Sequence, residues 1–91
     1  MSTDPRKAPG ADLPAWVDHI ARELGVDPAL VDIDRVLGVA ADVAHSVARP
    51  AVPVTMLVAG LAVASGRAGD DVLATVERAA LAWASDENVL P

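Results

Sequence analysis

The sequence contains no cysteine, no phenylalanine and no tyrosine. Without thiols the chain can form no disulfide, no zinc site with thiolate ligands and no cysteine nucleophile. The two tryptophans are the only aromatic residues, so the 53% of hydrophobic residues is supplied mainly by alanine, valine and leucine. Side chains this small predict a core in which helices pack closely.

Basic residues are also scarce. Seven Lys and Arg face 13 Asp and Glu, which gives a net charge of -6. A surface of this sign repels phosphate backbones, and the sequence shows no basic stripe. We therefore expect no nucleic-acid binding. The polar beginning "MSTDPRKAPGAD" lacks the apolar segment of a secretory signal. We therefore expect a cytoplasmic protein.

The length of 91 residues is that of one domain, near the lower end for a domain held by its core alone. We expect a flexible N-terminal segment over residues 1–11, a helical domain over 12–85 and a tail over 86–91. Valines recur at spacings of three and four rather than alternating with polar residues, which favours helices over strands.

The sequence predicts an all-α fold, a compact bundle of four main helices plus one short helical turn. Pro14 and Gly25 are start and stop signals of the first helix, and Pro50 disfavours helical geometry just before it. At "VDPALVD", Asp27 is expected to cap a single turn that begins at Pro28. The four helices are predicted over residues 13–25, 33–48, 53–64 and 70–85.

The periodicity also predicts which side chains face inward. Both tryptophans fall in these stripes and are expected to be buried. The third helix is apolar nearly all round, so we expect it to be central, with any uncovered part serving as an association surface. The predicted inner positions are Leu13, Trp16, Val17, Ile20 and Leu24, then Val36, Leu37, Ala40, Val43, Ala44 and Val47, and finally Val72, Leu73, Val76, Ala80 and Trp83.

One long run lacks charge, the 17 residues between Arg49 and Arg67. Seventeen residues lie at the lower limit for crossing a bilayer. The run contains two prolines, and its uninterrupted helical part can start only near Pro53, which leaves about 20 Å of rise. A buried core helix is therefore expected rather than a membrane span.

The stretch "AHSVARPAVPVT", residues 44–55, is the candidate site. In one interpretation it is only a helix corner: Pro50 ends one helix, Pro53 helps to begin the next, and Arg49 is a terminal cation tied to Asp42 or to a carbonyl. In the other, the corner holds a phosphate or carboxylate with the amides of the next helix. The candidate anion-binding residues are Arg49, His45, Ser46 and Thr55.

No catalytic or metal site is expected elsewhere. His19 and Glu23 have ligand spacing on one helical face, but a metal site needs more convergent ligands, so a surface pair is favoured. Ser46 lacks the Gly-rich elbow of a nucleophile. We therefore expect a protein that is not an enzyme and that has neither a catalytic residue nor a cofactor.

The segments "LPAWVDHIARELGVD" and "AHSVARPAVPVTMLVAGLAVASG", followed by an Ala-rich last helix, resemble the DUF6457 family of small helical domains from high-GC bacteria. The resemblance covers residues 12–85. It implies a domain that occurs alone or fused behind nucleotidyltransferases similar to molybdenum-cofactor guanylyltransferases. This chain has neither a Gly-rich nucleotide loop nor paired metal-binding aspartates, so it is not the transferase itself.

Three functions remain in competition. The first is a non-catalytic interaction module, either a homo-oligomer or an accessory of an enzyme of molybdopterin guanine dinucleotide biosynthesis. The second is a small-ligand or anion-binding domain centred on the Arg49 corner. The third is a carrier protein, which the sequence disfavours because no serine follows an acidic residue at a helix start.

Overall fold

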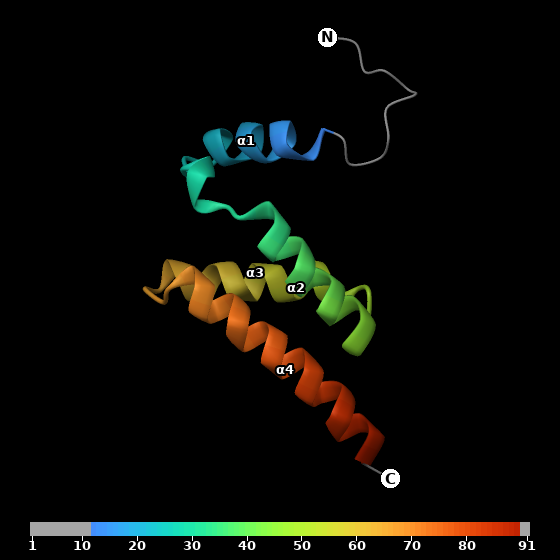
Figure 1. The fold of residues 1–91 in the computed structure, drawn as a ribbon. Coiled ribbons are helices and arrows are strands. Elements are labelled where there is room, and N and C mark those ends of the chain that lie inside the picture. Colours follow the sequence, from blue (N-terminus) through green and yellow to red (C-terminus); the bar gives the residue numbers. More distant parts are fainter. Residues whose placement is uncertain (1–11, 90–91) are drawn as a thin grey trace. The chain divides into compact units, whose positions relative to one another are not determined.

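The computed structural model describes residues 12–89, with side chains as far as Ser85. The described residues form four α-helices and one 3₁₀ turn and contain no strand, which confirms the all-α class (Figure 1). The predicted flexible segment over residues 1–11 lies outside the described part, as do residues 90 and 91. In chain order the elements are α1 (Leu13–Glu23), η1 (Pro28–Leu30), α2 (Ile33–Ser46), α3 (Ala51–Ala64) and α4 (Gly69–Val89).

The chain divides into two compact units, of which the first ends at Ile33 and the second begins at Asp34. In the first unit, α1 begins with Pro14 in its first turn, as predicted. The chain leaves the helix through Leu24 and Gly25, and the φ of 72° at Gly25 suits glycine. The amide of Val26 donates to the carbonyl of Ala21 at 2.7 Å, and that of Gly25 to Arg22 at 3.1 Å. This Schellman pair satisfies carbonyls that the helix end leaves open.

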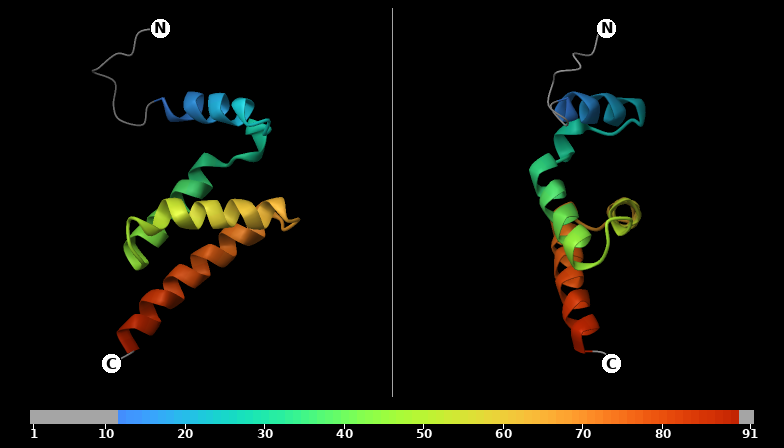
Figure 2. Two further views of the ribbon diagram at one scale, coloured as in Figure 1. Left: turned by 180° about the vertical axis from the view of Figure 1, so that it is seen from behind. Right: turned by 90° about the vertical axis from the view of Figure 1, so that its right-hand side faces the viewer.

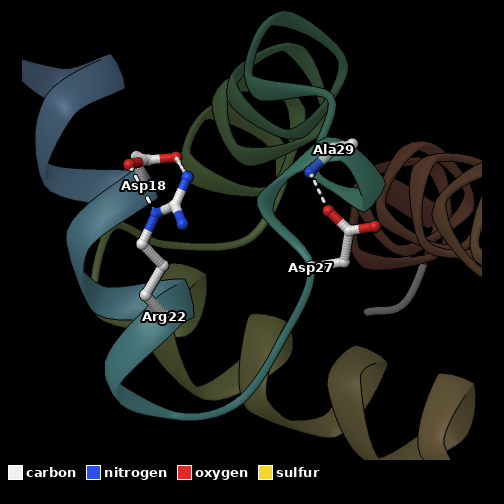
Figure 3. A network of polar contacts seen from close by, with 4 residues as sticks. All are labelled: Asp18, Arg22, Asp27 and Ala29. Carbon is white, nitrogen blue, oxygen red and sulfur yellow. Dashed lines mark hydrogen bonds and ion pairs between the residues drawn. The ribbon is translucent and has the colours of Figure 1, made fainter.

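The short turn η1 also forms where it was expected. The side-chain Oδ1 of Asp27 accepts a hydrogen bond from the amide of Ala29 at 2.9 Å (Figure 3). Pro28 follows the cap and begins the turn, since its missing N–H is not needed there. Asp27 and Pro28 thus have the roles that the sequence assigned to them.

In the second unit four helix boundaries differ from the predicted ones, by one to four residues. The helix α2 ends at Ser46 rather than Ala48, and α3 begins at Ala51 rather than near Pro53. Pro53 is tolerated inside α3 because it falls in the first turn, where no intrahelical partner for an N–H exists. The helix α4 continues to Val89, so residues 86–89 of the expected tail are helical.

The core of the second unit lies where α2, α3 and α4 meet. Val39 and Val43 of α2 and Ala80 of α4 are almost fully buried. Val39 was absent from the predicted inner stripe, whereas Leu37, which was included, is half exposed. At 100° per residue Leu37 lies about 160° around the helix from Val39, so both cannot face one core. The partly buried residues around this core are Ala51, Val52, Met56, Leu73 and Val76.

An ion pair also joins α2 to α4. Nη1 of Arg35 lies 3.3 Å from Oε2 of Glu77, and both side chains are about one-third exposed. Partial burial reduces the screening of such a pair by solvent. The contact fixes the N-terminal part of α2 beside the middle of α4.

The prediction that both tryptophans are buried is wrong. Trp16 is 55% exposed and Trp83 is 53% exposed. The Trp16 ring contacts His19, one turn further along α1, with 5.9 Å between ring centroids. Trp83 lies on α4 one turn beyond Ala80, the last buried residue of that helix as far as its side chains are described. Each indole follows the helical period of its stripe, but both lie at the margin of the packed region.

Candidate functional site

The four residues of the predicted anion site lie on α2, on α3 and on the connection between them. His45 and Ser46 are the last two residues of α2, and Arg49 lies in the connection to α3. Thr55 lies in the second turn of α3 and is partly buried, whereas Arg49 and His45 are exposed. The four residues therefore do not lie on one helix.

Arg49 makes no side-chain hydrogen bond or ion pair within the described part of the chain, so the expected tie to Asp42 is absent. The helix α2, which carries Asp42, ends at Ser46, three residues before Arg49. Arg49 is left as a cation at the start of α3.

The amides at the start of α3 are not available to an anion. Ala51 donates to the carbonyl of Ala48 and Val52 to that of Arg49, each at 3.1 Å. Pro53 has no N–H, and the next amide is paired within the helix with the carbonyl of the N-cap residue, Pro50. The corner thus offers an anion a guanidinium group but no cradle of backbone donors.

An apolar groove lies beside this corner, with a cavity volume of about 250 Å³. Thr55 is its one hydroxyl-bearing lining residue, and the exposed Trp83 forms part of its wall. It is bounded by all three helices of the second unit. The lining residues are Val43, Val47, Thr55, Val76, Ala79, Ala80 and Trp83.

An exposed apolar surface of the second unit lies on α3. Four large side chains are each more than 60% exposed, and they recur at the i, i+3, i+4 and i+7 positions of one helical face. No charged residue occurs between Arg49 and Arg67, so no ionised side chain interrupts this face. We call these four residues the α3 stripe: Val54, Leu57, Val58 and Leu61.

The prediction that this helix is central to the bundle is therefore wrong. Only Ala59 of α3 is buried. The right-hand view of Figure 2, which looks nearly along α3, shows that helix to one side of α2 and α4. A Cβ placed on Gly60 would meet no atom within 4 Å, so no other helix approaches α3 closely at this glycine. The expected uncovered part of the helix is confirmed.

The polar contacts of α1 lie on its surface. Nε of Arg22 lies 2.9 Å from Oδ2 of Asp18, and Nη2 donates to Oδ1 at 3.3 Å (Figure 3). The hydrogen bond from Arg22 lowers the pKa of the Asp18 carboxyl, and the same contact raises the pKa of Arg22. His19 and Glu23 form the expected surface pair, with Nε2 and Oε1 3.9 Å apart. Within residues 12–89 there is no group of three residues suited to hold a metal ion.

The sequence did contain a signal for the α3 stripe. A helix that is apolar all round is either enclosed or exposes an apolar face, and periodicity alone does not distinguish the two. The missing information was the number of neighbouring helices. No helix within residues 12–89 has both the length and the hydrophobicity needed to cross a membrane.

Comparison with known protein families gives one match, to the model described as "Domain of unknown function (DUF6457)", over residues 8–88. The match spans most of the chain, so the chain belongs to this family, as the resemblance predicted. The comparisons with curated proteins and with solved structures gave no match.

Proposed function

We propose that this member of the DUF6457 family is a non-catalytic interaction module that forms protein contacts through the α3 stripe. One observation carries the proposal, the alignment of four exposed Val and Leu side chains on a face without charge. Fully burying such a side chain contributes roughly 1.5–3 kcal/mol. A cluster of them exposed on one face is typical of a surface that is covered in use.

The class of enzyme that the module serves follows from the family resemblance alone. Domains of this kind are expected alone or behind nucleotidyltransferases of molybdenum-cofactor biosynthesis. A chain that lacks a nucleotide loop and paired metal-binding aspartates would act beside such an enzyme rather than perform its reaction. We propose this accessory role in molybdopterin guanine dinucleotide biosynthesis, in the cytoplasm.

The test is affinity purification of the tagged chain from its native host, with proteins identified by mass spectrometry. The wild type and the Leu81→Glu variant are expected to recover a molybdenum-cofactor nucleotidyltransferase, and Leu57→Glu is expected to lose it. Leu81 is the matched control because it is also an exposed leucine on a helix of the same unit. Equal recovery by Leu57→Glu would contradict the role of the stripe, and no recovery by the wild type would contradict the enzyme partner.

A second candidate function is the binding of a small anion at Arg49. The observation that favours it is the exposed guanidinium, which has no side-chain partner in the described part of the chain. The paired amides of Ala51 and Val52 weigh against it. We therefore rank anion binding below protein contact.

A further inference from the structure

We propose that a second copy of this chain occupies the α3 stripe and that the two α3 helices pack antiparallel. The inference rests on the proposed function and names the partner of that same surface. The enzyme would then be bound by the dimer. Three features carry the inference: the order of side chains along the stripe, the direction of the helix dipole and the absence of charge from the run that bears the stripe.

The stripe is complementary to itself in one direction only. An antiparallel pairing centred between Leu57 and Val58 sets Val54 against Leu61 of the second copy and Leu57 against Val58 of the second copy. Every contact then joins a larger side chain to a smaller one, as interdigitation requires. A parallel pairing would set leucine against leucine and valine against valine at each level.

The helix dipoles favour the same direction, because they are favourably opposed only in the antiparallel arrangement. The flanking charges do not choose the direction. In the register above, Arg49 lies level with Gly66 of the second copy, beside Arg67, and Asp70 and Asp71 follow further along the chain.

The charge of the whole chain explains why this face is suited to a second copy. Two chains with a net charge of -6 repel each other over most of their surfaces. The uncharged run from residue 50 to residue 66 is the segment through which they can approach without placing carboxylates together. It also buries no ionised group, so contact costs little desolvation of charge.

Disulfide cross-linking tests the pairing directly, because the chain has no cysteine of its own. Leu57→Cys lies beside the two-fold axis and is expected to cross-link with itself under mild oxidation. Val54→Cys is expected not to, since the two copies of residue 54 are about 10 Å apart along the helix axis, whereas a disulfide needs Cβ atoms about 4 Å apart. A mixture of Val54→Cys and Leu61→Cys proteins is expected to give the mixed disulfide. Circular dichroism of each variant verifies that it is folded.

The outcomes separate this inference from the proposed function. Self-cross-linking of Val54→Cys as efficient as that of Leu57→Cys would contradict the antiparallel direction. Absence of every cross-link in folded variants would overturn the second copy as the occupant, and the stripe would then belong to the enzyme or to another part of the same chain. If affinity purification still recovers the nucleotidyltransferase through Leu57, the proposed function survives that result.

Discussion

Buried residues in this protein are few and small. Within the described part they are Ala21, Val39, Val43, Ala59, Val72 and Ala80. Val39→Ala should lower the free energy of unfolding by about 2 kcal/mol, because it removes two methyl groups and leaves a cavity. Val63→Ala, at a 43% exposed position of α3, is the control and should change it by less than about 1 kcal/mol. If urea denaturation gave the two variants equal losses of unfolding free energy, the core would be wrongly placed.

The Asp18 carboxyl should contribute to stability in a way that depends on pH. Its pKa is lowered from 3.8 by the hydrogen bond from Arg22, so the contribution is present above the unfolded value and is lost as pH falls through the lowered folded value. NMR titration of Arg22→Gln should return the pKa of Asp18 toward 3.8. Arg78→Gln, which changes an exposed arginine of α4, is the control and should leave it lowered. An unchanged Asp18 pKa in Arg22→Gln would exclude the pair as its cause.

At two glycines of the second unit, substitution by alanine should have opposite effects on stability. Gly66 ends α3 with a φ of 111°, and its amide donates to the carbonyl of Val63 at 3.0 Å. Gly66→Ala should therefore destabilise the fold by about 1 kcal/mol or more. Gly38 lies inside α2, where an added Cβ meets nothing within 4 Å, so Gly38→Ala should stabilise by about 0.5–1 kcal/mol. Thermal melts that shift in the same direction for both variants would contradict this assignment.

The variant Arg49→Ala distinguishes two roles of the connection between α2 and α3, a helix corner that binds nothing and an anion-binding site. Because the guanidinium has no side-chain partner within residues 12–89, the variant should lose no more than about 1 kcal/mol. Added phosphate at fixed ionic strength should raise the melting temperatures of wild type and variant equally. A rise confined to the wild type would revive the anion site, with Lys7→Ala as a control for general charge effects.

The sequence was sufficient to predict the elements because their ends carry local signals. Gly25 and Asp27 act through their own backbone and nearest neighbours, so their roles follow from the residues beside them in the chain. The exposure of Leu57 and Trp83 does not follow from neighbouring residues, because it depends on how many helices surround α3 and α4. The end of α2 was placed too late for a related reason: Pro50 restricts only the residue before it, whereas the helix had already ended at Ser46.

At the scale of the whole molecule, stability depends on one face of α3, and the proposed association would use the other. The side of α3 that contacts α2 and α4 includes Val52 and Met56, which pack against the core. The α3 stripe contributes little to that core and, in the proposed dimer, becomes buried only between copies. A charge placed on the stripe should therefore prevent association while leaving the fold of each copy intact.

Sedimentation equilibrium at micromolar concentration tests this central claim most directly. The wild type and Leu81→Glu should sediment with twice the chain mass of 9.3 kDa, and Leu57→Glu should sediment as a folded monomer. A wild type that remains monomeric throughout the micromolar range, or a Leu57→Glu variant that remains dimeric, would contradict the account.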